Sequence, residues 1–165
     1  SGTYLAIPNS HRLQLTLKMR LRMNYATIED MQQTREALEL GVAKTAALNA
    51  TEEDVKALDY FLNRLLETAD PDYGREVDHA FHMHLGIAAH NPVMLTLLDS
   101  FSSSLRTVLQ HRREIIAKVP RGLELTNQTH VAIFEAVRDH DSERAGKAME
   151  KHFSVWQEIA GKSVG

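Results

Sequence analysis

The sequence predicts an all-α fold, an antiparallel bundle of six to seven helices. Apolar residues recur at helical spacing through most of the chain. Only residues 13–23 show the alternation of apolar and polar residues that is typical of a strand. Proline, glycine and asparagine separate the periodic segments at short intervals, as loops between antiparallel helices do. With 165 residues, of which 43% are hydrophobic, the chain can bury the core of one compact domain.

The N-terminal half contains the one ambiguous segment. Apolar residues alternate at period two between Leu13 and Met23, which would suit a strand, but every neighbouring segment is helical. We therefore interpret residues 9–26 as a linker helix. A long helix is expected from about Thr27 to Leu48. The capping box in 51–54 then predicts the start of a second helix of the bundle.

The remaining elements follow from turn residues. A turn is expected at Pro71, Asp72 and Gly74, before a third bundle helix that carries 78–89. The later helices are expected from Pro92 to about Ala117, from Leu123 to Arg138 after a turn at Pro120 and Gly122, and from Asp141, as the cap, to near Gly161.

Composition excludes several classes of function. The net charge of -3 argues against a broad basic face for nucleic acid, and the lack of cysteine excludes disulfides, thiolate metal sites and cysteine nucleophiles. No apolar run approaches the roughly 20 residues that span a membrane, and no signal peptide is visible. We therefore expect a cytoplasmic protein with no membrane partner.

Four residues could ligate a metal at the centre of the bundle. Asp78 and His82 are four positions apart and share one face of a helix, and His130 and His152 each lie on the apolar face of a later helix. Three imidazoles with one carboxylate suit zinc, nickel, manganese, iron or cobalt better than magnesium or calcium. Taken singly, each histidine could instead be a hydrogen-bonded core residue, and Asp78 could be a surface carboxylate.

The order of several short motifs resembles a known family, the C-terminal effector-binding (FCD) domain of FadR-subfamily GntR-type bacterial transcription regulators. The resemblance covers residues 27–165. Its motifs are Arg35-x-x-Leu38-Glu39, Thr51-Glu52-Glu53-Asp54, Asp78-x-x-Phe81-His82, Ala88-Ala89-x-Asn91, His130-x-x-Ile133-x-x-Ala136-Val137 and Ala145-x-x-Ala148-Met149-x-x-His152. The metal-binding members of the family space their ligands much as this chain does, by steps of 4, 48 and 22 residues.

The resemblance implies a set of roles. Asp78, His82, His130 and His152 would hold one divalent transition metal per subunit, with zinc expected before nickel, manganese, iron or cobalt. Arg35 would grip the carboxylate of a small organic acid, although an arginine on an amphipathic helix is usually a surface residue. Residues 1–8, with Ser1-Gly2-Thr3-Tyr4-Leu5, resemble the end of a winged-helix DNA-binding domain. The implied protein is a homodimer that meets DNA only through that N-terminal domain.

Two functions of different class remain open alongside the sensor of a carboxylate or hydroxyacid. One is a small metal-dependent hydrolase or lyase that uses the three histidines and Asp78, with Glu124 or Glu135 as the base. Neither glutamate stands at a diagnostic spacing from a ligand, so we do not expect an enzyme. The other is a metal-stabilised dimerisation module without an effector.

Overall fold

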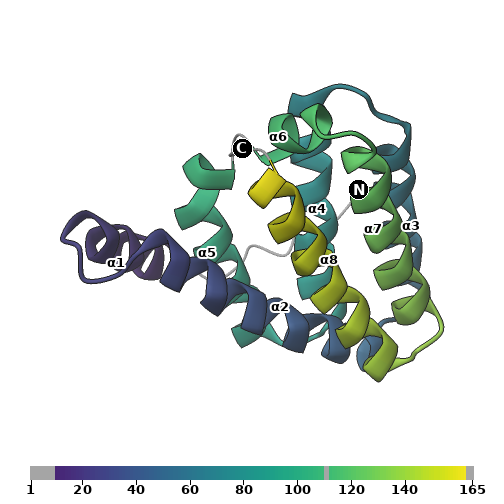
Figure 1. Ribbon diagram of the computed structural model, residues 1–165. Helices are drawn as coiled ribbons and strands as arrows, with labels where there is room; N and C mark the ends of the chain where they lie inside the picture. The colour runs from purple at the N-terminus through teal and green to yellow at the C-terminus, as the bar shows by residue number, and fades with distance from the viewer. Residues whose placement is uncertain (1–9, 110–111, 163–165) are drawn as a thin grey trace.

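The computed structural model describes residues 10–109 and 112–162, and within them it shows eight helices and no strand (Figure 1). The resemblance to a wing at residues 1–8 therefore lies outside the described residues. The helices are α1 (His11–Arg22), α2 (Ile28–Asn49), α3 (Glu52–Glu67), α4 (Pro71–Ala88), α5 (Pro92–Leu109), α6 (Arg112–Lys118), α7 (Gly122–Arg138) and α8 (Ser142–Lys162).

The all-α prediction is confirmed, and the ambiguous first segment is helical. The two capping boxes explain where α2 and α3 begin, because Thr27 and Thr51 each accept a hydrogen bond from the backbone of the aspartate three residues later. The helix expected from Pro92 to about Ala117 corresponds to α5 and α6, which lie on either side of residues 110–111, outside the described residues.

The turn expected at Pro71, Asp72 and Gly74 was also wrong, because these residues form the first turn of α4. The carboxylate of Asp70 accepts hydrogen bonds from the backbone N–H groups of Asp72 and Tyr73. Proline at the first helical position has no N–H that would need a partner, and its fixed φ already suits a helix. A proline and a glycine close together therefore marked a helix start here and not a loop.

The core lies where α2, α4, α7 and α8 face one another, with α3 packed on α4 and α7 (Figure 1). Its largest fully buried apolar side chains include Leu58, Phe81, Leu85, Ile133 and Met149. Helix α5 approaches α4 closely at Gly86, where an added Cβ would lie 3.0 Å from Leu98. This packing leaves the centre of the bundle enclosed on several sides.

Helix α1 is the least embedded element. It contains no buried residue, packs on α5, and lies at one side of the bundle (Figure 1). Its docking includes a polar contact, because Asp99 on α5 accepts hydrogen bonds from the Ser10 hydroxyl and from the Gln14 amide at 2.5 and 3.0 Å. None of the described helices is both long and apolar enough to cross a bilayer.

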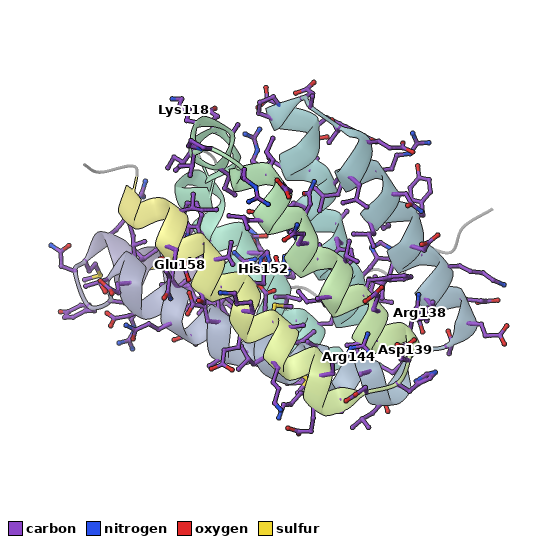
Figure 2. All side chains as sticks on the ribbon, turned by 45° about the vertical axis from the view of Figure 1, so that its right-hand side comes forward. Lys118, Arg138, Asp139, Arg144, His152 and Glu158 are labelled. Atoms are coloured by element: carbon purple, nitrogen blue, oxygen red, sulfur yellow. The ribbon has the colours of Figure 1, made fainter. Side chains whose placement is uncertain are left out.

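The charged residues at the turn between α7 and α8 contrast with the interior. Figure 2 shows Arg138, Asp139 and Arg144 gathered at this turn, where Asp139 pairs with Arg138 and with Arg144 at 2.9 Å each. Higher up on α8, His152 lies inside the bundle and is almost completely buried. The same helix thus carries ordinary surface ion pairs at one end and a buried titratable group near its middle.

Candidate metal centre

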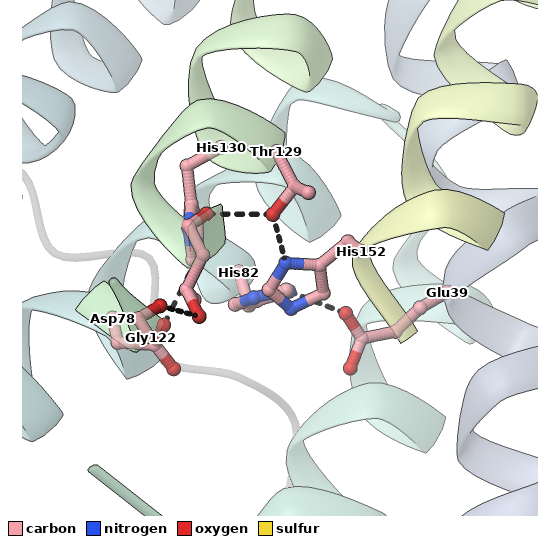
Figure 3. A network of polar contacts seen from close by, with 8 residues as sticks. Glu39, Asp78, His82, Gly122, Thr129, His130 and His152 are labelled. Carbon is pink, nitrogen blue, oxygen red and sulfur yellow. Dashed lines mark hydrogen bonds and ion pairs between the residues drawn. The ribbon is translucent and has the colours of Figure 1, made fainter. Parts of the chain in front are cut away.

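Three of the four predicted ligands meet in the interior. His82 comes from α4, His130 from α7 and His152 from α8, and each offers a ring nitrogen such that all three lie within 4.8 Å of one another (Figure 3). All three imidazoles are at most 2% exposed. A buried imidazole needs partners for both of its ring nitrogens, so the contacts of the Nδ1 atoms decide what the Nε2 atoms can do.

The partner of His130 fixes its tautomer. Its Nδ1 lies 2.9 Å from the backbone carbonyl oxygen of Thr126, one turn earlier on α7. A carbonyl can only accept, so Nδ1 carries the proton and Nε2 keeps its lone pair.

The tautomer of His152 follows from a longer chain of contacts. Its Nδ1 lies 2.9 Å from the hydroxyl of Thr129. That hydroxyl donates its one hydrogen to the Thr126 carbonyl at 2.6 Å, so it must accept from His152. One carbonyl of α7 therefore anchors two of the three histidines (Figure 3), and both present Nε2 as an acceptor.

His82 is oriented by a carboxylate. Its Nδ1 contacts Glu39 on α2, which is 1% exposed and also pairs with Arg35. Burial alone would raise the pKa of Glu39, but the charges of Arg35 and His82 and the hydrogen bonds from both outweigh it and lower that pKa to about 2. An ionised carboxylate only accepts, so His82 donates from Nδ1. In the neutral form of His82, the form that can ligate a metal, the lone pair is therefore on Nε2.

The result is a set of three Nε2 lone pairs directed into one buried space. Among the described residues, neither His82 Nε2 nor His130 Nε2 has a hydrogen-bond partner. Buried acceptors that face one another without a donor are costly, and a bound cation removes that cost. Each ring donates its Nδ1–H to a fixed partner on the side away from the cluster. In metal sites, such hydrogen bonds orient the imidazole ligands.

Asp78 stands at the edge of this cluster and is 27% exposed. Its Oδ1 lies 3.0 Å from His130 Nε2, yet the contact lacks the geometry of a hydrogen bond. Both atoms are acceptors once His130 carries its proton on Nδ1, so neither donates to the other. Two ligands about 2.1 Å from one ion and about 90–109° apart would be separated by about 3.0–3.4 Å, which this contact matches.

Arg35 is buried rather than at the surface. Its Nε donates to Glu39 at 2.5 Å, and its side chain is 7% exposed. The bond uses Nε, so the two terminal nitrogens of the guanidinium remain as a second pair of donors. The structure thus brings Arg35 to the same network as His82, through Glu39.

Sequence reasoning missed the residues behind the ligands. The contact of Glu39 with His82 was not predicted from the sequence. Thr126 and Thr129 gave a usable signal, because Thr126 precedes His130 by one helical turn. The neighbouring histidines do not join the cluster, since His84 bonds the Ala80 carbonyl and His90 pairs with Asp54.

The base considered for an enzyme is engaged elsewhere. Glu124 forms two hydrogen bonds with Arg121 at 2.8 Å on the exposed start of α7. Glu135 lies 3.6 Å from Arg144. Both side chains are about half exposed.

Comparison with known proteins gives consistent results. The FCD domain family matches residues 30–155. The chain is 30% identical over 125 residues to the putative L-lactate dehydrogenase operon regulatory protein of Escherichia coli, covering 76% of this chain and 48% of that protein. It is 27% identical over 160 residues to the transcriptional regulator LutR of Bacillus subtilis, covering 96% and 73%. It is 30% identical over 123 residues to the galactonate operon transcriptional repressor of E. coli, covering 73% and 52%.

These matches bear on one of the alternatives left open by the sequence, the metal-dependent enzyme. The chain spans about half the length of most of the curated relatives it matches. The relatives are named as regulators, which supports a regulatory domain and not the hydrolase or lyase. The chain belongs to the FCD family and is the FCD domain of a GntR-type transcription regulator.

Proposed function

We propose that this domain senses a small carboxylate or hydroxyacid at a divalent transition metal held by Asp78, His82, His130 and His152. The observation that supports it is the convergence of three Nε2 lone pairs in a buried space, each opposed by a fixed partner on Nδ1. Three imidazoles and one carboxylate suit zinc, nickel, cobalt, iron or manganese. Four protein ligands leave positions open on an ion that accepts five or six.

The relatives support the class of effector. One is named for an L-lactate dehydrogenase operon and another for a galactonate operon. Lactate and galactonate both carry a hydroxyl beside the carboxylate, so either could chelate one ion through two oxygens. Arg35 would hold the carboxylate through its terminal nitrogens, since a guanidinium matches the two oxygens of a carboxylate.

In the whole protein, a homodimer would carry this signal to DNA. The DNA contacts would come from an N-terminal winged-helix domain preceding α1, as the regulator names of the relatives suggest. Arg35 and Glu39 lie on α2, the helix that follows α1 directly. Closing the site around an acid would therefore act on the element nearest the linker helix and shift the protein between two arrangements.

Calorimetric titration of the zinc-loaded domain with lactate, galactonate and related acids tests this proposal. Wild type should bind at least one acid and return it chemically unchanged. Arg35→Met should keep zinc but lose about 2–4 kcal/mol of binding free energy, roughly 30- to 800-fold in affinity, because a charge-assisted contact is lost. Asp78→Ala should weaken zinc and acid together.

The control is Arg64→Met, which removes an exposed arginine from α3 and should change neither zinc nor acid binding. If Arg35→Met binds the best acid as tightly as wild type, the role of Arg35 is wrong. If wild type holds zinc and binds no acid at all, the sensor proposal fails and a metal-stabilised module takes its place.

A further inference from the structure

Glu39 divides its carboxylate between two buried partners. Oε1 accepts from Arg35 Nε at 2.5 Å, while Oε2 contacts His82 Nδ1. Helix α2 thus connects the proposed acid-binding arginine to one metal ligand through one side chain. All three residues are at most 5% exposed, so water does not readily substitute for a lost partner.

We infer that Glu39 is a positioning residue whose two oxygens keep the His82 Nε2 lone pair on the metal while holding Arg35 for the acid. This inference rests on the proposed metal and acid site. Glu39, which is not itself a ligand, would couple the metal-binding half of that site to Arg35, the acid-binding half.

Glu39 faces two hydrogen-bond donors. Arg35 Nε–H and His82 Nδ1–H both donate, and an ionised carboxylate meets them with two acceptors. A glutamine in the same place has one acceptor oxygen and one NH₂ donor. Because the arginine can never become an acceptor, the amide oxygen must turn to Arg35 and the NH₂ to His82. His82 would then have to accept on Nδ1 and carry its proton on Nε2, where it cannot ligate a metal.

The other two histidines do not depend on such a residue. His130 donates to a backbone carbonyl of α7, and His152 donates to a threonine hydroxyl that the same carbonyl fixes. Neither contact involves a charged side chain or another helix than α7 and α8. His82 is therefore the ligand whose orientation responds to the state of Arg35. Because coupling between sites is reciprocal, metal and acid should each strengthen the binding of the other.

The decisive variant is Glu39→Gln, tested in the intact 165-residue chain with Zn²⁺ as the probe. Competition with a chromophoric chelator should show zinc affinity about 10- to 100-fold weaker than in wild type, the usual cost of removing a partner behind a metal ligand. In the zinc-free protein, the imidazole ¹⁵N shifts of His82 should report exchange of the protonated nitrogen from Nδ1 to Nε2. Those of His130 and His152 should stay unchanged. Glu36→Gln is the matched control on the same helix and should leave all of these unchanged, because Glu36 meets Gln157 and not the cluster.

A second substitution should reverse the first. Arg35→Met removes the competing donor, so in Arg35→Met/Glu39→Gln the amide oxygen is free to accept from His82 Nδ1. Zinc affinity should then return to within a few-fold of the Arg35→Met single variant, although two charged groups have been removed. A general structural role for Glu39 predicts the opposite, since the double variant would be the weaker one.

The possible outcomes test the metal site and the role of Glu39 separately. If wild type binds no zinc, the proposed metal site fails, yet the ¹⁵N shifts still decide whether Glu39 sets the tautomer of His82. Unchanged His82 shifts in Glu39→Gln, or a double variant no better than Glu39→Gln, would overturn the inference. If Glu39→Gln does not fold, Arg35→Met/Glu39→Gln is compared with Arg35→Met/Glu39→Leu. Arg35→Met/Glu39→Leu lacks any acceptor for His82 and should bind zinc more weakly than Arg35→Met/Glu39→Gln. Equal zinc affinity of the two double variants would overturn the inference.

Discussion

The centre of the bundle and helix α1 are both rich in apolar residues, but these residues are buried in the centre and partly exposed on α1. Around the histidines, α2, α4, α7 and α8 contribute many completely buried apolar residues, such as Leu85 and Met149. Helix α1 is rich in leucine and methionine as well, yet its Leu15 and Met19 are about half exposed. The difference lies in the partners available, since α1 packs on α5 whereas each central helix packs on several neighbours.

The comparison shows that enclosure, rather than hydrophobicity, separates the two regions. Period-two leucines give α1 no single apolar stripe, so no face of it can be buried entirely against one neighbour. The central helices are enclosed by several neighbours, and they bury a few polar groups, such as the three histidines, whose Nδ1 partners lie inside the bundle. We therefore expect the central bundle to determine stability and ligand binding, and the exposed side of α1 to be available to a second subunit.

The largest expected contrast is between truncations in the two regions. Leu85→Ala should lower the free energy of unfolding by about 2–5 kcal/mol, because a cavity forms beside the cluster. Met19→Ala, at a residue 58% exposed, should change it by less than about 0.5 kcal/mol at concentrations where the chain is monomeric. Urea denaturation monitored by circular dichroism measures both.

Association sharpens the same contrast. If α1 contributes to the proposed homodimer, Met19→Ala should weaken self-association, whereas Leu85→Ala should leave it unchanged in the folded fraction. Analytical ultracentrifugation measures the dimer dissociation constant of both variants. A monomeric wild-type mass at micromolar concentration would count against the dimer. Equal unfolding costs for the two variants would contradict the division into two regions.

A second, smaller effect concerns the metal. At a free zinc concentration 100 times its dissociation constant, binding should stabilise the fold by about 2.7 kcal/mol. For a chain of this size that corresponds to a melting temperature about 5–11 °C higher than with chelator. His152→Ala should abolish the difference. His84→Ala should retain it, because His84 lies outside the cluster and bonds the Ala80 carbonyl. Identical melting of wild type with zinc and with chelator would reject the metal site.

The smallest effect concerns a helix start. Burial would raise the pKa of Asp54, but hydrogen bonds from Thr51 and His90 outweigh it, so the folded pKa is lowered. A lowered folded pKa contributes stability above the unfolded value near 3.9, and this is lost as the pH falls through the folded value. Thr51→Ala should cost about 1 kcal/mol near neutral pH and raise the Asp54 pKa, measured by carboxyl ¹³C titration.

The matched control is Thr27→Ala, which removes the equivalent cap from α2 and should act on Asp30 in place of Asp54. Ser10 offers the contrast at the start of α1, because its hydroxyl bonds Asp99 and caps no backbone group. An Asp54 pKa unaffected by Thr51→Ala would show that the cap does not hold the carboxylate in solution.

Much of the fold could be predicted from the sequence because capping boxes and helical periodicity are local signals. Thr27, Thr51 and Asp141 each marked a helix start within a residue or two. Pro71 was misread because proline near glycine suits both a loop and a first helical turn, and only the Asp70 cap distinguishes them.

The site was predictable in part for a similar reason. The spacing of the three histidines carried enough information to bring them together. The contact between Glu39 and His82 joins residues 43 positions apart on different helices, so no periodicity within one helix could indicate it. The family resemblance supplied the role of Arg35, and the structure shows in addition that it is buried and paired.

The pairing of Arg35 with Glu39 also determines the charge that a ligand would encounter. These two charges cancel within one buried contact. Metal ligation requires neutral imidazoles, so in a metal-bound site Asp78 would be the one remaining anion among Arg35, Glu39, Asp78 and the three histidines. A divalent ion would then leave the closed site with a single net positive charge, and one monoanionic carboxylate would neutralise it. In a medium of low dielectric, a surplus charge is expensive, so a dianion of equal size should be disfavoured. If the proposed metal and acid bind here, the buried ion pair would favour acids with one negative charge over acids with two.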